Sequence, residues 1–358
     1  MTELRLRSDL IGRTPYGAPQ LDVPVRLNVN ENPFPPSPRL VAAITDAVAQ
    51  AAQNLNRYPD RDAIGLRKAL ADYLKTESSV QFQWENIWPA NGSNEVMHHL
   101  LQAYGGPGRK LVTFSPTYSM YPDYCRETFT EYLEVPRTES FQITRESIDS
   151  ALVLAPDILV LCSPNNPTGT ILDPEILTYV LDKFSGLVIV DEAYAEFRDS
   201  SVDSATKIIA GHPNLVVTRT MSKAFSCAGL RLGYAVAHPD IIAACQLVRL
   251  PYHLSAVTQA VAQTALAHSH ELLSQVSLLR TERDLLFAWL IEHGYFAFPS
   301  GANFILFGKF ADRDSVWQQL LKQGVLIRQS GPDGWLRVSI GTPEENELFR
   351  KALLSIKS

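Results

Sequence analysis

Short apolar runs alternate with stretches of helical periodicity between about residues 86 and 237. The runs have the length and composition of buried strands, whereas the stretches between them repeat apolar residues at helical spacing. Buried strands separated by helices indicate an α/β domain whose mostly parallel sheet is covered on both faces. The candidate strands are Asn86–Pro89, Leu111–Phe114, Ile158–Cys162, Leu187–Val190, Leu215–Thr218 and Leu232–Ala237.

The chain on either side of this region has different patterns. Its opening is rich in turn residues, and helical periodicity begins near Pro38 and returns in Leu66–Leu74. Residues 254–293 are predicted to form one long helix or two joined helices. Short strands then alternate with helices, which is typical of a smaller α+β domain. These last candidate strands are Phe304–Phe307, Val325–Ile327 and Trp335–Ile340.

The length of the chain agrees with two domains, because 358 residues exceed what one hydrophobic core usually organises. We expect an N-terminal arm with a small-domain segment at residues 1–37 and a large domain at 38–253. A small C-terminal domain, with the long connecting helix, is expected at 254–358.

Composition and charge exclude several classes of protein. The chain is 46% hydrophobic and 20% charged, which is ordinary for a globular protein. Its formal charge is −6 and its basic residues are scattered, so we expect neither a nucleic-acid partner nor a membrane partner. The N-terminus lacks the apolar run of a signal peptide, and the four cysteines are far apart, which favours reduced thiols in the cytoplasm. The histidines lack companion ligands, so no metal site is expected.

Polar segments follow the candidate strands of the large domain. In open α/β sheets, ligands bind just beyond the carboxyl ends of the strands. Five consecutive strands that end in polar segments therefore predict a functional site at one edge of the sheet. The segments are Gly92–Asn94, Pro116–Tyr118, Asn165–Gly169, Asp191–Tyr194 and Thr220–Lys223.

Lys223 is the candidate nucleophile of this site. Most lysines are simply solvated. Here, however, Thr220 and Ser222 can donate hydrogen bonds to a phosphate, and Arg231 follows closely. A partly desolvated lysine has a depressed pKa and becomes the amine that Schiff-base chemistry requires.

Asp191 ends an almost wholly apolar strand, where an isolated carboxylate is expensive to bury without a cationic partner. One interpretation is a helix N-cap. The other is a partner for a protonated pyridine nitrogen, which keeps that ring an electron sink. Tyr194 then lies close enough in sequence to reach the ring's phenolic oxygen. Beside Lys223, Asp191 favours a pyridoxal-phosphate enzyme.

Two further motifs have more than one interpretation. Gly92–Asn94 precedes a helical pattern, so its amides hold a phosphate or its residues cap a helix. Arg337 lies in a strand pattern, where it is either a solvated arginine or a bidentate clamp for a carboxylate.

Three motifs together resemble the class I/II aminotransferases of PLP fold type I: Ser163–Gly169, Asp191–Tyr194, and Thr220–Phe225 followed by Arg231. Within that group the chain is similar to the histidinol-phosphate aminotransferases. This second resemblance rests on Thr14–Gly17, Leu27–Pro33, Asn56–Asp60, Gly324–Arg328 and Leu336–Thr342. It covers essentially the whole chain.

The resemblance implies roles around a pyridoxal 5'-phosphate cofactor. Lys223 would bind it as a Schiff base and move the substrate proton, and Asp191 would pair with the pyridine nitrogen. Asn166 and Tyr194 would bond the ring oxygen, and Tyr118 would stack on the ring. The residues implied around the phosphate are Ser93, Asn94, Thr220, Ser222 and Arg231.

The resemblance also implies a homodimer with shared active sites, in which Tyr58 reaches the neighbouring subunit's cofactor. The implied substrate-binding residues are Tyr16, Asn30, Arg328 and Arg337. The implied reaction is a ping-pong transamination between L-histidinol phosphate and 2-oxoglutarate, which gives imidazole acetol phosphate and L-glutamate in histidine biosynthesis. Alternatives are an aromatic amino-acid aminotransferase or a β-lyase on the same fold, and a non-catalytic module of this fold.

Overall fold

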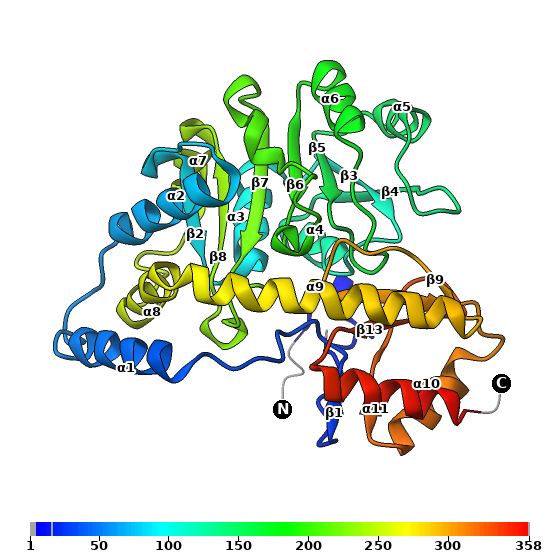
Figure 1. Cartoon of the computed structure of the whole chain (residues 1–358). Coiled ribbons are helices and arrows are strands. Elements are labelled where there is room, and N and C mark those ends of the chain that lie inside the picture. The colour runs from blue at the N-terminus through cyan, green and yellow to red at the C-terminus, as the bar shows by residue number, and fades with distance from the viewer. Residues whose placement is uncertain (1–4, 16, 357–358) are drawn as a thin grey trace.

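The computed structural model describes residues 5–15 and 17–356, and its centre is a seven-stranded sheet (Figure 1). The strand order is β2-β8-β7-β6-β5-β3-β4. Only β8 runs against its neighbours, so the other strands are parallel to one another. The bounds are β2 Ile87–Ala90, β3 Lys110–Ser115, β4 Glu131–Pro136, β5 Ile158–Cys162, β6 Leu187–Asp191, β7 Leu215–Thr220 and β8 Gly233–Ala237. The predicted α/β fold with a mostly parallel sheet is confirmed.

Strand β4 was not predicted from the sequence. It lies at the edge of the sheet and pairs only with β3. Most of its residues are exposed or half-buried, and Glu131 and Glu134 interrupt its apolar residues. An edge strand of this kind lacks the continuous apolar run that identifies a buried strand.

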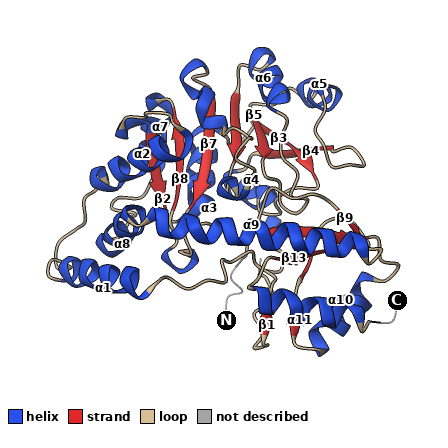
Figure 2. Cartoon of the chain, in the orientation of Figure 1, coloured by secondary structure: helices blue, strands red, loops and turns tan. Residues whose placement is uncertain are grey.

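Helices cover both faces of the sheet, as Figure 2 shows, because strand side chains alternate between the faces. In β5, Leu159 and Leu161 belong to one apolar core, whereas Ile158 and Val160 belong to the other. The second core contains α3 (Gly92–Tyr104), α4 (Tyr121–Thr128) and α7 (Pro239–Val248). The first core contains α2 (Ile64–Ser78), α5 (Arg145–Val153) and α6 (Pro174–Lys183).

A four-stranded antiparallel sheet, in the order β12-β13-β10-β9, forms the C-terminal part together with two helices. These elements confirm the short strands expected there. Their bounds are β9 Phe296–Ala297, β10 Phe304–Gly308, α10 Arg313–Lys322, β11 Val325–Leu326, β12 Arg328–Gln329, β13 Trp335–Ser339 and α11 Pro343–Leu354. Strand β1 (Val25–Arg26) pairs in parallel with β11, so the N-terminal segment joins this part of the molecule.

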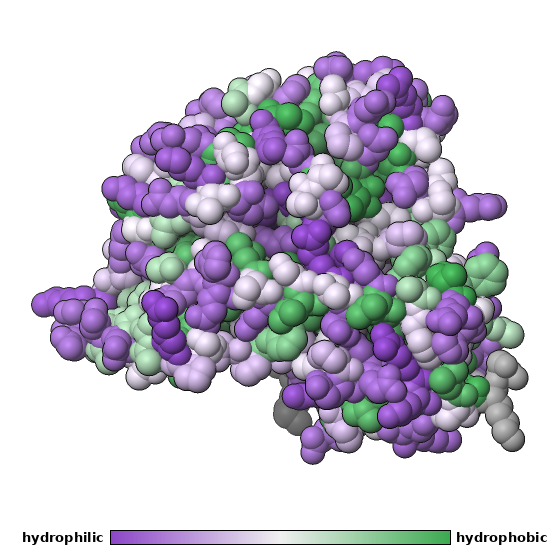
Figure 3. Space-filling view, in the orientation of Figure 1, coloured by the Kyte–Doolittle hydropathy of each residue, from purple (hydrophilic) through white to green (hydrophobic). Residues whose placement is uncertain are grey.

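The helical stretch expected at 254–293 is two helices, α8 (Ala256–Ala267) and α9 (Ser269–Glu292). In Figure 1, α9 runs past the lower ends of the seven-stranded sheet and in front of the second sheet, and α1 (Pro38–Ala52) lies below α8. The same face is mostly polar in Figure 3, with small separate apolar areas that include some over α9, where Leu278 and Leu285 are exposed. Within the described ranges, no helix combines the length and apolarity needed to cross a bilayer. The domain boundaries at 37/38 and 253/254 stay predictions.

Candidate active site

A cavity of about 630 Å³ lies beyond the carboxyl ends of the parallel strands. The second sheet closes it through β12 and β13, and the segment after β1 runs along its wall. It brings together nearly all the predicted site residues, from segments far apart in the sequence. Those in its lining are Asn30, Ser93, Asn94, Tyr118, Asn166, Asp191, Tyr194, Thr220, Ser222, Lys223, Arg231, Arg328 and Arg337.

Lys223 is partly buried in this cavity, three residues after the end of β7. Its Nζ donates a hydrogen bond to the backbone carbonyl of Val29 at 2.8 Å. Burial, and then the positive charges of Arg337 and Arg231, lower the pKa of Lys223 to about 8, although Glu31 opposes the shift. The structure thus gives Lys223 the depressed pKa that a nucleophilic amine requires.

Asp191 is the last residue of β6 and only 5% exposed, and it caps no helix. Its Oδ2 accepts a hydrogen bond from the Tyr121 hydroxyl at 2.8 Å, and its Oδ1 accepts one from Thr218 at 3.1 Å. Burial raises its pKa, although both hydroxyl donors oppose this. Among the described residues, no lysine, arginine or histidine forms an ion pair with Asp191. A buried carboxylate whose donors are two hydroxyls and the backbone amide of Ala193 fits a cationic group bound in the cavity.

Tyr121 and Thr218 were missed in the sequence. Thr218 lies two residues before Thr220 on β7, so strand alternation puts both on the same face, and that spacing was a usable signal. Tyr121 begins α4, and no spacing rule relates its position to Asp191.

Tyr194 is the centre of a buried amide network. Its hydroxyl accepts hydrogen bonds from the side-chain amides of Asn30 at 3.0 Å and Asn166 at 3.5 Å. This leaves the hydroxyl proton of Tyr194 to donate into the cavity, and burial raises the pKa of Tyr194 to about 12. Ser339 on β13 fixes Asn30 by accepting from its backbone N–H and donating to its Oδ1.

Arg337 completes this network from β13. Its guanidinium donates to Oδ1 of Asn166 and to the carbonyl of Asn28, the latter at 2.9 Å. The residue is only 5% exposed, so the interpretation of a solvated strand-face arginine is wrong. Arg328 on β12 lies directly opposite Arg337 in the antiparallel register, and both line the cavity.

Hydroxyls, backbone amides and a guanidinium in the lining of the cavity form an anion cup. Ser222 accepts from Nη1 of Arg231 at 3.4 Å, and Thr220 donates to Oγ of Ser222 at 3.1 Å. Helix α3 begins at Gly92, so Ser93 and Asn94 lie in its first turn and do not cap it. Amides at a helix N-terminus favour a bound anion, and the donor set fits a phosphate.

Gly92 is essential to the shape of this cup. Its φ is +83°, and a Cβ there would lie 2.8 Å from Nη2 of Arg231. Behind it, a Cβ on Gly233 would lie 2.1 Å from the backbone nitrogen of Ser93, so β8 and the start of α3 approach closely. Gly92 is favoured by its positive φ, and Gly233 is required by a contact with backbone that a side chain would block.

Three other predicted residues have different outcomes. The Tyr118 hydroxyl donates to Oδ1 of Asn94 at 3.4 Å, and its ring meets Tyr121 edge-on. Tyr58 does not line the cavity. It is 79% exposed and stacks on Tyr252 with ring centroids 4.3 Å apart. Tyr16 lies outside the described residues.

No cluster of histidine, cysteine, aspartate or glutamate side chains suits a metal ion in the part of the chain that the structure describes. The four cysteines are free and buried, as expected: Cys125, Cys162, Cys227 and Cys245.

Comparisons with known proteins identify similar chains. The family model described as aminotransferase class I and II matches residues 23–353. The histidinol-phosphate aminotransferase of Thermobifida fusca is 55% identical, over 99% of this chain and 95% of that protein. A putative histidinol-phosphate aminotransferase structure from Erwinia carotovora atroseptica has a TM-score of 0.83 at 28% identity, and the match covers 94% of this chain and 97% of that one. The enzyme from Sinorhizobium meliloti, solved with pyridoxal 5'-phosphate, has the same fold (TM-score 0.82, 23% identity, 92% and 90% coverage).

Proposed function

The chain belongs to the class I and II aminotransferases, and from this premise we propose that it transaminates L-histidinol phosphate with 2-oxoglutarate, using pyridoxal 5'-phosphate. The products are imidazole acetol phosphate and L-glutamate, in histidine biosynthesis. The name and high identity of the full-length relatives support the substrate. One structural observation carries the proposal: Lys223, Asp191 and the anion cup share a single cavity with the arginine pair Arg328 and Arg337.

The donor set of the cavity fits the cofactor at both ends. The anion cup of Thr220, Ser222, Arg231 and the start of α3 would hold the phosphate. Asp191 would pair with the pyridine nitrogen, and Tyr194 and Asn166 would donate to the ring oxygen. Tyr118 would stack on the ring. When bound, the cofactor supplies an electron sink for the charge that develops at the substrate α-carbon.

The chain's own residues then hold the substrate and move its proton. Lys223 would supply the amine that holds the cofactor, and its pKa of about 8 suits a group that both accepts and returns a proton near neutral pH. Arg337 would bind the anionic group nearest the reacting carbon, because its guanidinium is held by Asn166 and by the carbonyl of Asn28. That group is the α-carboxylate of glutamate or the phosphate of histidinol phosphate. Arg328 would bind the side-chain carboxylate of glutamate, or would share the phosphate of histidinol phosphate with Arg337.

We also propose a homodimer with shared active sites, in the cytoplasm. Support comes from an exposed apolar surface outside the cavity, made of Leu55, Tyr58, Leu250 and Tyr252. Arg249 joins its two segments by donating to the carbonyl of Arg61 at 2.8 Å. Burial of this surface against a second copy would bring Tyr58 to the partner's cofactor. The free, buried cysteines agree with a reducing compartment.

Steady-state transamination by the purified holoenzyme tests the function. We expect kcat/KM for L-histidinol phosphate, with 2-oxoglutarate as acceptor, to exceed the value for L-phenylalanine by about 100-fold or more, since contacts of two arginines with a doubly charged phosphate are worth a few kcal/mol more than one contact with a carboxylate. Equal values would identify an aromatic amino-acid aminotransferase instead. Sedimentation of the wild type beside a Tyr58→Ala/Tyr252→Ala variant tests the dimer.

A further inference from the structure

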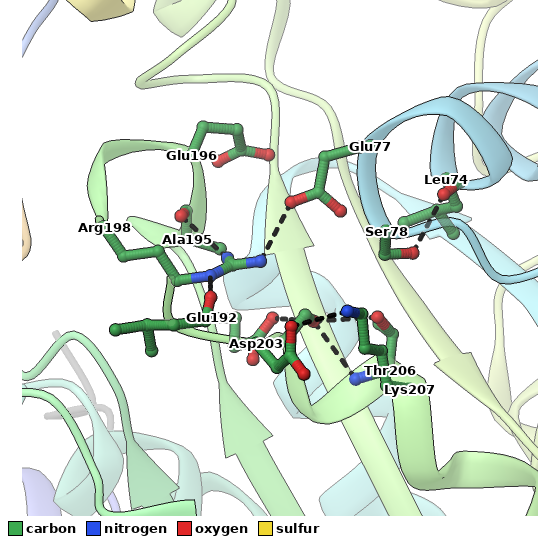
Figure 4. A network of polar contacts seen from close by, with 12 residues as sticks. Leu74, Glu77, Ser78, Glu192, Ala195, Glu196, Arg198, Asp203, Thr206 and Lys207 are labelled. Carbon is green, nitrogen blue, oxygen red and sulfur yellow. Dashed lines mark hydrogen bonds and ion pairs between the residues drawn. The ribbon is translucent and has the colours of Figure 1, made fainter. Parts of the chain in front are cut away.

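A buried ionic cluster lies behind the active site, centred on Arg219 of β7. The Arg219 side chain is 0% exposed, and its guanidinium contacts Glu192 at 2.8 Å and Glu196 at 3.1 Å. Glu77 of α2 lies 3.5 Å away and also binds Arg198 at 3.1 Å. Figure 4 shows Arg198 reaching Glu77, with Glu196 beside them. The cluster therefore joins α2, β7 and the segment that follows β6.

The cluster and the cavity lie on opposite faces of the same strand ends. In β6, Leu187 and Ile189 pack in the core that contains α3 and α4, and alternation puts Asp191 on that side. In β7, Leu215 and Val217 pack in the other core, which puts Arg219 on the side of α2. Glu192 and Arg219 are therefore direct sequence neighbours of Asp191 and Thr220, which line the cavity, and both take part in the ionic cluster behind it.

The cluster holds the segments that carry Asp191, Tyr194 and Thr220. Glu192 directly follows Asp191, and its carboxylate also accepts from Ser204 at 2.7 Å and from the backbone N–H of Ala205 at 2.8 Å. Glu196 lies in the short 3-10 helix Ala195–Phe197 that directly follows Tyr194. Arg219 itself lies next to Thr220, and Lys223 follows shortly after.

Residues of α2 anchor the cluster from outside the site. The Tyr73 hydroxyl donates to Glu196 at 3.2 Å, and Glu77 receives both arginines. Burial opposes the charge on Arg219, but the carboxylates of Glu77, Glu192 and Glu196 outweigh it and raise the pKa of Arg219 well above its ordinary value. The guanidinium therefore stays charged and keeps its fork of directed hydrogen bonds.

We propose that Arg219 is a positioning residue for the cofactor site. It ties the ends of β6 and β7 and the helix after Tyr194 into one unit, and so sets where Asp191 and Tyr194 stand relative to Lys223. This inference rests on the proposed function, because the geometry that it fixes is that of the cofactor-binding groups. A buried ion pair adds little stability over apolar packing, whereas its directed contacts define position.

The variants Arg219→Lys and Glu196→Gln test the proposal in the holoenzyme. Lysine keeps the positive charge of Arg219 but cannot form the several directed hydrogen bonds of a guanidinium. Glutamine keeps the size of Glu196 but removes its negative charge. For both we expect a folded protein, a fall in kcat of about 100-fold with a smaller change in KM, and weaker cofactor affinity by equilibrium dialysis. The pH midpoint of the bound cofactor's visible absorbance should also shift, because it reports the placement of Asp191 and Tyr194.

Arg67→Met is the matched control. Arg67 is another buried arginine, but it donates to the carbonyl of Trp84 at 3.0 Å and lies over the Trp84 ring, outside the cavity. We expect it to lower the denaturant midpoint while the absorbance midpoint and kcat stay at wild-type values. If Arg219→Lys does not fold, Glu196→Gln decides the question.

Wild-type kcat and absorbance midpoint in folded Arg219→Lys or Glu196→Gln would overturn the proposal. So would losses that match those of Arg67→Met at equal loss of stability. A wild-type protein that binds no pyridoxal 5'-phosphate would remove the proposed function and this inference together. A normal wild type with unaffected variants would remove the inference alone.

Discussion

Arg328 and Arg337 are direct cross-strand partners in the antiparallel pair of β12 and β13, and both line the cavity. Like charges in this arrangement destabilise a sheet unless something of opposite charge lies between or beside them. Arg337 is nearly fully buried, and it donates to the Asn166 side chain and to the Asn28 carbonyl. The approach of two guanidinium groups at the cavity supports the proposal that the pair binds the doubly charged phosphate of histidinol phosphate or the two carboxylates of glutamate.

Substitution of the two arginines should affect substrates differently. Arg328→Gln is expected to raise KM for histidinol phosphate and glutamate by about 10- to 100-fold, because one charged hydrogen-bonding partner is lost. It should leave KM for phenylalanine nearly unchanged, because Arg337 alone would bind the single carboxylate of that substrate. Arg337→Gln should weaken the binding of all three substrates and so raise KM for each of them. Steady-state kinetics with the three amino donors checks this, and equal effects of the two substitutions would contradict it.

Tyr121→Phe should move the acidic limb of the pH profile. The Tyr121 hydroxyl donates to Asp191 and opposes the rise that burial causes in the pKa of Asp191. Removal of this donor raises that pKa further, so Asp191 becomes protonated at a higher pH. We expect kcat/KM to fall about tenfold on the acidic side and less at alkaline pH. Tyr124→Phe, on the same helix, is the control, and its pH profile should keep the wild-type midpoint. If both variants shift that midpoint equally, Tyr121 has no specific role in setting the pKa of Asp191.

Lys223→Met should stabilise the cofactor-free protein. Burial lowers the pKa of Lys223 from 10.5 to about 8, so the unfolded state binds the proton more tightly than the folded state does. The resulting penalty is about 3 kcal/mol below pH 8 and disappears as the pH rises from 8 towards 10.5. Loss of the bond to the Val29 carbonyl offsets about 1 kcal/mol of the gain.

Urea unfolding at several pH values measures this effect. The advantage of Lys223→Met over the wild type should be about 2 kcal/mol near pH 7 and should shrink above pH 8. A variant less stable than the wild type at pH 7 would show that Lys223 is not an energetic cost to the fold.

Gly92→Ala should weaken phosphate binding more than it weakens the fold. An alanine there combines an unfavourable positive φ with a Cβ 2.8 Å from Arg231, so the guanidinium must move out of the anion cup. We expect about tenfold weaker binding of pyridoxal 5'-phosphate, which corresponds to one charged hydrogen bond. Gly211→Ala is the control, because nothing lies within 4 Å of its Cβ position. If Gly92→Ala and Gly211→Ala bind pyridoxal 5'-phosphate with equal affinity, the proposed role of the anion cup in phosphate binding is wrong.

The residues that sequence patterns predicted best are those at the ends of buried parallel strands. Asp191, Thr220 and Lys223 follow apolar runs, and the rule for open α/β sheets brings them to one edge without knowledge of the strand order. Strand β4 was missed because an edge strand need not be apolar. Strands β1 and β12 have two residues each, which is too short for any periodicity.

Relationships that depend on register or on buried side chains could not be predicted in the same way. The pairing of Arg328 with Arg337 requires the alignment of β12 and β13, and the bond from Tyr121 to Asp191 requires the packing of α4 on the sheet. In the sequence, Arg219 is an ordinary strand residue, because only the fold brings the three carboxylates around its guanidinium. The roles of Tyr16 and Tyr58 stay predictions, as do the domain boundaries.

The parallel pairing of Val25 with Val325 has a consequence for the order in which the site folds. The segment that gives Lys223 its backbone acceptor, and Tyr194 its Asn30 amide, is held by a strand that is far away in the sequence. Contacts of large sequence separation cost more loop-closure entropy than the pairing of strands that are close in sequence. We therefore expect this wall of the cavity to form after the central sheet, as one of the last steps of folding.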